Sequence, residues 1–176
     1  MITVVSKKFK WDFSSVQVPI GNKFSAKLKK WGYEHIPADC VYKPGSQYGR
    51  TTDMHITVKY GLHTTDVEQV KNKIKGFGKF EVTLGEITRF AKPDKDYDVV
   101  KLEVESDKLK ELYKLLGELE NSDEWPEFRP HITFAYIENG TCRELSGNTS
   151  FKNQKINVDR VVFSPKDGGN KRSINL

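Results

Sequence analysis

One short motif occurs twice in the sequence and carries the residue types that acid–base catalysis needs. The first copy spans residues 55–60 (HITVKY) and the second spans residues 131–136 (HITFAY). Imidazole titrates near neutral pH, so one histidine can accept a proton while the other donates one. A threonine hydroxyl can donate a hydrogen bond to a non-bridging phosphate oxygen, where negative charge increases in the transition state. The repeated motif therefore predicts phosphodiester cleavage, with four catalytic residues: His55, Thr57, His131 and Thr133.

Both motifs are predicted to begin a β-strand, and strand geometry explains the spacing within them. Side chains alternate between the two faces of a strand, so each histidine shares a face with the threonine two residues later. The same alternation places Lys59 beside Thr57, and it places Tyr60 and Tyr136 on the opposite face, where we expect packing. A single H-x-T segment in a strand is usually structural, but two copies with matching flanks favour a function.

The hydrophobic pattern predicts an α+β fold that alternates strands with helices. Strands are expected at 15–20, 54–60, 80–87, 99–104, 130–136, 156–163 and 171–176. Helices are expected at 22–31, after the cap residues 64–66, and after Ser106. No long linker or low-complexity segment interrupts the chain, so we expect residues 1–176 to form a single domain with two strand-rich lobes.

Composition and charge narrow the class of protein. Hydrophobic residues make up 36% and charged residues 30% of the 176 residues, which is typical of a soluble globular protein, and no apolar run is long enough to span a membrane. Two distant cysteines, Cys40 and Cys142, favour reduced thiols in a cytoplasmic protein. The net charge of +5 indicates a mild bias toward anionic partners. The charged residues are spread along the chain, which is not typical of a protein that binds duplex DNA.

The two motifs resemble those of the 2H phosphoesterase superfamily, which includes the RNA ligase-like 2′,3′-cyclic phosphodiesterases. The resemblance extends from about Arg50 to Leu176, and the segments 48–50 and 60–62 look most like phage-encoded members. It implies a bilobal fold with two pseudo-symmetric antiparallel-sheet lobes, helices on the outside and a central cleft. It also implies catalysis without a metal. The substrates that it implies are 2′,3′-cyclic phosphates, 2′-5′-linked oligonucleotides, RNA ends, or cyclic oligonucleotide signals of antiphage immunity.

Several other residues are candidates for binding a nucleotide or RNA substrate. Lysine and arginine side chains near the motifs are candidates for binding phosphate, and surface ion pairing is their alternative role. Aromatic side chains in polar loops could stack on a base, and packing is their alternative role. The candidates are Lys59, Arg50, Arg129, Tyr48, Tyr97, Trp125 and Phe128.

The sequence predicts neither a metal site nor a cofactor. No pair of residues shows a zinc-ligand spacing such as HxxxH or CxxC, and no glycine-rich phosphate loop is present. The leading hypothesis is a metal-independent phosphodiesterase acting on a 2′,3′-cyclic or 2′-5′-linked phosphate. The alternatives are a nuclease for cyclic oligonucleotides, a non-catalytic RNA- or nucleotide-binding protein, and RNA ligation. The sequence leaves open the order of acid and base and the oligomeric state.

Overall fold

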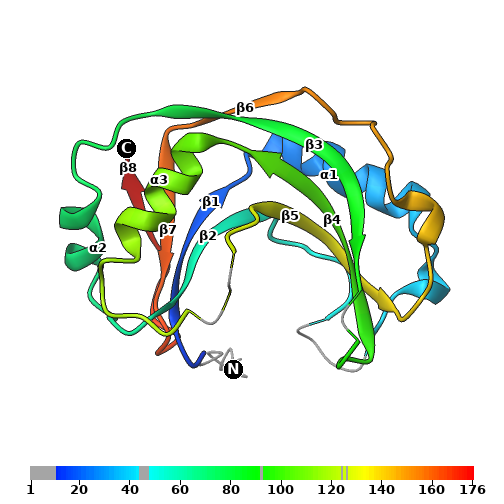
Figure 1. The fold of residues 1–176 in the computed structure, drawn as a ribbon, viewed down its shortest axis with the longest axis horizontal. Helices are drawn as coiled ribbons and strands as arrows, with labels where there is room; N and C mark the ends of the chain where they lie inside the picture. Colours follow the sequence, from blue (N-terminus) through cyan, green and yellow to red (C-terminus); the bar gives the residue numbers. More distant parts are fainter. Residues whose placement is uncertain (1–10, 44–47, 92, 124, 126) are drawn as a thin grey trace, which may run out of the picture.

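The fold is built on one curved antiparallel sheet, seen as an arch in Figure 1. The computed structural model describes residues 11–43, 48–91, 93–123, 125 and 127–176. Its strands are β1 (Ser14–Pro19), β2 (His55–Leu62), β3 (Phe80–Phe90), β4 (Tyr97–Glu105), β5 (His131–Glu138), β6 (Lys155–Val158), β7 (Arg160–Ser164) and β8 (Arg172–Asn175). Its helices are α1 (Asn22–His35), α2 (Val67–Lys73) and α3 (Asp107–Leu116), with short 3₁₀ turns η1 (Ala38–Cys40) and η2 (Arg143–Leu145).

The strand order divides the sheet into two halves of four strands each. The order is β6-β3-β4-β5-β2-β1-β7-β8, so β5 and β2 are neighbours at the middle of the sheet. These two strands carry the two motifs, and they pair antiparallel through Ile56 and Ile132. The predicted α+β class and the two antiparallel lobes are confirmed. The lobes are joined edge to edge into one continuous sheet, which brings the motifs together.

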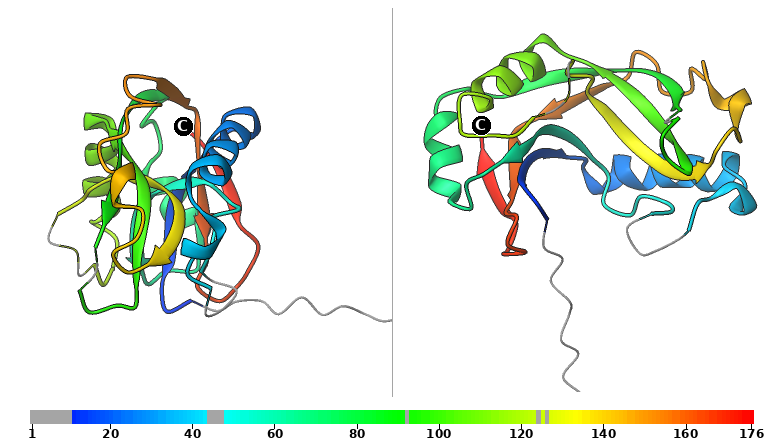
Figure 2. Two further views of the ribbon diagram at one scale, coloured as in Figure 1. Left: turned by 90° about the vertical axis from the view of Figure 1, so that its right-hand side faces the viewer. Right: turned by 60° about the horizontal axis from the view of Figure 1, so that its bottom comes forward.

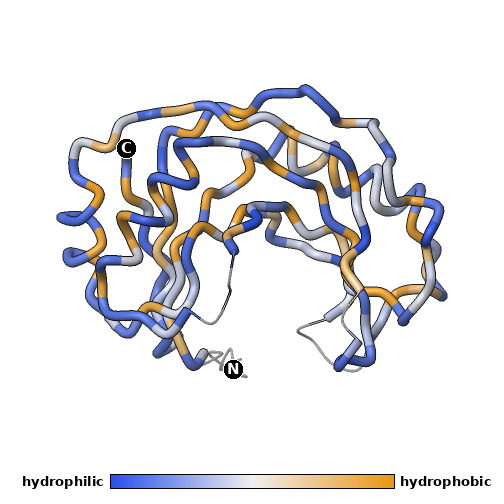
Figure 3. Tube along the Cα trace, viewed as in Figure 1, coloured by the Kyte–Doolittle hydropathy of each residue, from blue (hydrophilic) through white to orange (hydrophobic). Residues whose placement is uncertain are grey.

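Alternating side chains explain why the motif strands form and which face is buried. Ile56 and Ile132 have no exposed surface, whereas the motif histidines and threonines are partly exposed. Figure 3 shows hydrophobic residues interspersed with hydrophilic ones along the strands. One face of the sheet therefore packs into the core, and the other face presents polar groups.

Helices α2 and α3 begin at side-chain caps, and the helices cover the buried face. Asp66 accepts a hydrogen bond from the Glu68 backbone N–H at the start of α2, and Ser106 accepts one from Leu109 at the start of α3. Each motif strand is covered by a helix from the other half of the sequence, because α1 packs on β5 and α3 packs on β2. Figure 2 shows α1 on the opposite side of the molecule from α2 and α3.

The predicted strand at 156–163 is wrong, because this segment forms two strands. β6 pairs with β3 at one end of its half of the sheet, and β7 pairs with β1 in the other half. Asp159 separates them, and both Asp159 and Arg160 are exposed. Two consecutive exposed residues shift the alternation of buried positions by one residue. In the sequence, the two adjacent charged residues Asp159 and Arg160 mark this break.

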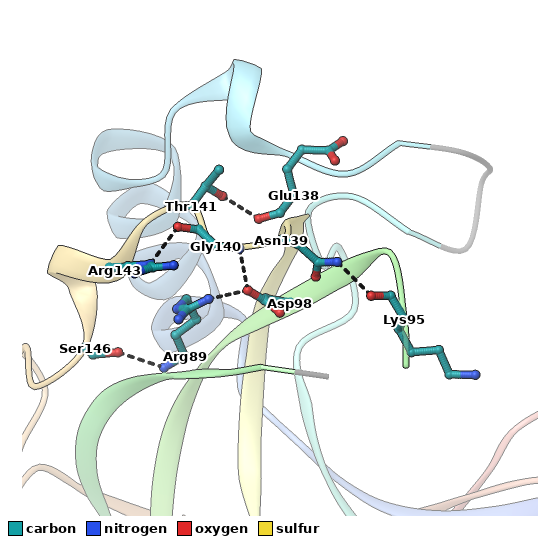
Figure 4. Close-up of polar contacts among 9 residues, drawn as sticks. All are labelled: Arg89, Lys95, Asp98, Glu138, Asn139, Gly140, Thr141, Arg143 and Ser146. Carbon is teal, nitrogen blue, oxygen red and sulfur yellow. Dashed lines mark hydrogen bonds and ion pairs between the residues drawn. The ribbon is translucent and has the colours of Figure 1, made fainter. Parts of the chain in front are cut away.

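A buried aspartate fastens the outer end of β4 to the turn after β5. Asp98 is 3% exposed, pairs with Arg89 of β3, and accepts a hydrogen bond from the Gly140 backbone N–H at 2.8 Å (Figure 4). In the same turn, the Arg143 Nε donates to the Gly140 carbonyl at 3.0 Å, and Asn139 donates to the Lys95 carbonyl at 2.7 Å. These bonds fix the rim of the second lobe.

Within the described residues, no helix is long and apolar enough to cross a membrane.

Candidate active site

A β-bulge interrupts the alternation in the first motif. In the β1–β2 register, Gln17 lies opposite Thr57 and the next residue, Val16, lies opposite Lys59, so Val58 has no partner. An extra residue in one strand reverses the faces of the residues that follow it. Lys59 consequently turns away from the face of Thr57, and Tyr60 turns toward it. The faces predicted from regular alternation for Lys59 and Tyr60 are therefore wrong.

The second motif contains a bulge at the equivalent position. In the β4–β5 register, Lys101 lies opposite Thr133 and Val100 lies opposite Ala135, so Phe134 has no partner. Tyr136 then returns to the face of Thr133, contrary to the face predicted from regular alternation. Both motifs therefore present three side chains to one face: the histidine, the threonine two residues later and the tyrosine at the end of the motif.

The central strand pair places the two motifs side by side in the sheet. Because β2 and β5 are antiparallel and Ile56 pairs with Ile132, the register around this pair sets one motif's histidine beside the other motif's threonine. His55 thus neighbours Thr133, and Thr57 neighbours His131. All four side chains lie on the face opposite the buried isoleucines. The result is the pseudo-twofold arrangement of two imidazoles and two hydroxyls that the sequence predicts.

The two imidazole rings are held in the same way. The Nδ1 atom of His55 lies 2.8 Å from the Asp53 carbonyl oxygen, and the Nδ1 atom of His131 lies 2.8 Å from the Arg129 carbonyl oxygen. A carbonyl oxygen only accepts, so each Nδ1 carries a hydrogen. The Nε2 atom is then a base in the neutral ring and an acid in the charged ring. Each histidine can serve either role without changing its contact to the backbone.

Burial lowers the pKa of both histidines below the usual value of 6.5. Desolvation of the imidazolium is the largest cause in each case, and the backbone carbonyl opposes it by stabilising the charged ring. The neighbouring charges differ between the two rings. The pKa of His55 is raised by Asp53 and lowered by Lys171. The pKa of His131 is lowered by Lys101 and His55 and raised by Glu103.

A cavity of about 460 Å³ lies over the sheet face that carries the motif histidines and threonines, which we call the catalytic face for its proposed role. Its wall includes Thr57, His131 and Thr133 of the motifs, and His55 lies within electrostatic range of His131. Tyr60 and Tyr136, the tyrosines that the bulges turn inward, also line it. The remaining lining residues are Val58, Phe90, Tyr97, Val99, Lys101, Tyr113, Asp123, Trp125, Glu127, Phe128 and Arg129.

Lys59 is held on the α3 side of the sheet and is not part of the cavity wall. Its side chain is 4% exposed, and its Nζ lies 2.7 Å from Asp123 Oδ2. The Tyr113 hydroxyl donates to the same oxygen at 2.5 Å, and this bond is the main cause that raises the pKa of Tyr113 to about 12. The Asp123 Oδ1 accepts from the Trp125 backbone N–H at 3.0 Å. Lys59 therefore anchors the loop that carries Trp125.

We expect Lys59→Met to lower the free energy of unfolding by about 3–5 kcal/mol, because it leaves the Asp123 carboxylate buried without a cation. The matched control is Lys73→Met, which removes a lysine from the more exposed pair with Glu118. That control should change the free energy of unfolding by about 1 kcal/mol or less. Urea denaturation of both variants measures the difference. Equal effects of the two substitutions would contradict the anchoring role.

Four of the predicted substrate contacts line the cavity. Trp125 is 59% exposed at its mouth, and Phe128 stacks on Tyr113 with ring centroids 4.4 Å apart. Arg129 also lines it, and both its Nε and its Nη2 donate to Glu127 Oε2. Tyr97 is the fourth. These side chains come from β4 and from the loop that precedes β5, so they lie at two sides of the catalytic face.

Two predicted substrate contacts lie elsewhere. The Arg50 guanidinium donates to the carbonyl oxygens of Gly32 and Ile36, at 2.8 and 2.6 Å, and so caps the end of α1. Tyr48 packs against Tyr97 and Tyr136, with ring centroids 5.1 and 5.3 Å away. Tyr48 therefore contacts two tyrosines of the cavity wall without lining the cavity itself, whereas Arg50 takes part in helix capping.

The cavity wall also contains Tyr60, Tyr136 and Lys101, which the sequence did not predict as substrate contacts. Tyr60 and Tyr136 recur at the same place in the two motifs, and this recurrence is a signal that regular alternation obscured. Lys101 and Glu103 are charged residues two apart in the otherwise apolar segment 99–104, which is the pattern of one polar face. Lys101 is 8% exposed despite its charge.

The comparison with protein families decides where the chain belongs. A family model described as the anti-CBASS protein Acb1 matches residues 46–170, which include both motifs. The chain belongs to the Acb1 family. The resemblance to 2H phosphoesterases that the paired H-x-T motifs indicate is thereby confirmed. No curated protein sequence matches this Acb1-family chain.

Solved structures share the fold of this Acb1-family chain at low sequence identity. Kluyveromyces marxianus Usb1 is 10% identical with a TM-score of 0.63, and the match covers 94% of this chain and 99% of that one. The apo form of E. coli LigT is 16% identical with a TM-score of 0.63, and 95% of each chain is covered. TT0787 of Thermus thermophilus is 13% identical with a TM-score of 0.59, covering 93% and 94% of the two chains.

Proposed function

We propose that this chain is a phosphodiesterase that cleaves a nucleotide phosphodiester by acid–base catalysis with His55 and His131. The observation that carries the proposal is the β2–β5 register, which sets each histidine beside the threonine of the other motif. One neutral ring takes a proton from the attacking hydroxyl or water, and one charged ring donates a proton to the departing oxygen. The threonine hydroxyls of Thr57 and Thr133 bind the non-bridging oxygens.

A cyclic oligonucleotide is the substrate class that the family description favours. The matching model is described as an anti-CBASS protein, and cyclic oligonucleotide signals of antiphage immunity are among the substrates that the resemblance to 2H phosphoesterases implies. With such a substrate, the base removes the proton of a ribose 2′-hydroxyl. The 2′-oxygen then bonds to phosphorus as the bond to the 5′-oxygen breaks, and the acid protonates that leaving oxygen. The products are a linear chain with a 2′,3′-cyclic phosphate end and a 5′-hydroxyl.

Hydrolysis of a 2′,3′-cyclic or 2′-5′-linked phosphate is the second candidate, and it uses the same four side chains with water as the nucleophile. Structural relatives support nucleotide binding in general: LigT has been solved with 3′-AMP and Usb1 with uridine monophosphate. Aromatic side chains on two sides of the catalytic face, including Tyr97 and Trp125, supply surfaces on which bases can stack.

A substrate panel in excess EDTA tests the proposed function. The panel contains cyclic di- and trinucleotides, 2′,3′-cyclic mononucleotides, 2′-5′ oligoadenylates and RNA with cyclic phosphate ends. Within the described residues, no group of three His, Cys, Asp or Glu side chains could hold a metal ion, so we expect turnover to persist in EDTA. A 2′,3′-cyclic end in the product indicates internal attack, and a 2′-phosphate end indicates attack by water. Binding without turnover of any compound would overturn the phosphodiesterase proposal in favour of a nucleotide-binding protein.

We expect a bell-shaped dependence of kcat/KM on pH, because one imidazole must be neutral and the other charged. Burial lowers the pKa of both histidines, so both limbs of the bell should lie on the acid side of those expected for exposed histidines. A bound phosphodiester anion favours imidazolium, so the optimum of kcat should lie at higher pH than that of kcat/KM. Steady-state rates between about pH 4.5 and 9 measure both profiles, and flat profiles would contradict the paired roles.

A further inference from the structure

The catalytic face of the second lobe carries a partly buried ion pair. In the β4–β5 register, Lys101 lies opposite Thr133, and Glu103 lies opposite His131. The Lys101 Nζ is 2.8 Å from Glu103 Oε1, and the two side chains are 10% and 32% exposed. Since Lys101 also lines the cavity, a positive charge is fixed at the wall that the catalytic threonine and histidine share.

The first lobe has no charge at the equivalent positions. Gln17 lies opposite Thr57, and Pro19 lies opposite His55, in the β1–β2 register. Gln17 donates to the hydroxyl of Ser15, which lies two residues away on its own strand. The two lobes match in their motifs and bulges, but the residue paired with the motif threonine is a lysine in the second lobe and a glutamine in the first. On the first-lobe side, the cation that acts on His55 is Lys171, which is paired with Asp53 and has a side chain that is 49% exposed.

Glu103 holds the lysine without occupying all of its donors. The same Glu103 Oε1 accepts a hydrogen bond from the Thr88 hydroxyl at 2.6 Å, and the Lys101 ammonium lies 5.6 Å from the centroid of the Phe90 ring. An ammonium group has three N–H donors, and among the described residues Lys101 forms an ion pair with Glu103 alone. Donors therefore remain for an anion bound in the cavity.

Other cations near the site are arranged differently. Lys59 faces α3 and is paired with Asp123. Arg129 lines the cavity, but its side chain is 70% exposed and paired with Glu127. Lys171 pairs with Asp53, and its side chain is 49% exposed. A cation in a largely buried setting attracts an anion far more strongly than an exposed one, because less water screens the charge.

We propose, on the basis of the proposed function, that Lys101 is a further catalytic residue whose ammonium group binds a non-bridging oxygen of the scissile phosphate beside Thr133. Negative charge on these oxygens grows as the attacking oxygen bonds to phosphorus, so a fixed cation lowers the energy of the transition state more than that of the bound substrate. Glu103 is a positioning residue, which keeps the ammonium at the cavity wall before the substrate arrives.

The test compares Lys101→Met with the wild type on whichever substrate of the EDTA panel the wild type cleaves. We expect kcat/KM to fall by about 10²–10³, with most of the loss in kcat. Lys101→Arg retains the charge and should recover part of the rate. The matched control is Lys152→Met, which removes a more exposed lysine paired with Glu86 at 2.7 Å. Activity of Lys101→Met equal to that of Lys152→Met would overturn the proposal.

A double variant distinguishes loss of activity through misfolding from loss of activity through removal of the cation. Lys101→Met alone leaves the Glu103 carboxylate without its cation, whereas Lys101→Met with Glu103→Gln removes both charges and should restore thermal stability. The double variant should stay as inactive as Lys101→Met, since neither contains the cation. Recovery of activity together with stability would overturn the proposal, because the ion pair would then be purely structural.

Binding of inorganic phosphate distinguishes failure of this proposal from failure of the proposed function. We expect phosphate to raise the melting temperature of the wild type and of Lys152→Met, and to do so far less in the stable double variant. A wild type that cleaves no compound in the panel overturns the phosphodiesterase proposal, while phosphate binding that depends on Lys101 still supports the cation site. Equal protection of the wild type and the double variant would overturn the Lys101 proposal even if the wild type is active.

Discussion

Replacing either motif histidine with alanine is expected to lower kcat/KM by about 10²–10⁴, the usual contribution of a positioned acid or base. The physical reason is the contact that fixes each ring, a bond from Nδ1 to the carbonyl oxygen of Asp53 or Arg129. That bond selects the tautomer and leaves Nε2 for proton transfer, so no other described group can take over the same role without moving. Steady-state kinetics on the cleaved substrate measure the loss in His55→Ala and His131→Ala.

Two further variants test whether the loss of activity is specific to the motif histidines and whether these two act together. His63→Ala removes a histidine whose ring contacts Ser122 and Glu120, and it should retain wild-type activity. The double variant His55→Ala with His131→Ala should be about as slow as each single variant, because groups that act as a unit do not contribute additively. A double variant whose loss equals the product of the single losses would argue that the two rings act independently.

The paired motif residues could be identified from the sequence because their signal is local and repeated. Two H-x-T segments with matching flanks identify His55 and His131 without any knowledge of the fold. Strand alternation places Ile56 and Ile132 on the face opposite the motif histidines, and both isoleucines are buried. The pairing of these two isoleucines, which brings the motifs together, depends on contacts between residues far apart in the chain, and no local pattern specifies it.

The site's outer residues could not be predicted because they depend on cross-strand partners. A bulge forms where one strand has an extra residue relative to its neighbour, so Val58 and Phe134 cannot be identified as bulges from their own strands. Their consequence is large, since every later side chain in the motif changes face. Lys59 thereby leaves the cavity, and the position of Lys101 follows from the register of β4 against β5.

Replacing Thr57 or Thr133 with valine is expected to lower kcat by about 10²–10³, the scale observed when one donor to a developing oxyanion is removed. Valine keeps the branched shape of threonine but has no hydroxyl, so the variants test the hydrogen bond with little change in packing. Both threonines are partly exposed, and their loss should leave the melting temperature close to that of the wild type. Thermal unfolding and steady-state kinetics on the same samples measure the two effects.

The size of the effect on KM separates transition-state stabilisation from simple binding. If the hydroxyls act mainly on charge that develops during the reaction, kcat should fall and KM should change little. Thr57→Ser and Thr133→Ser retain a hydroxyl and should recover much of the rate. Thr83→Val is the matched control, because Thr83 lies in β3 opposite Glu105 and outside the cavity wall. Valine variants at positions 57 and 133 that are as active as Thr83→Val would remove the threonines from the mechanism and leave phosphate binding to other groups.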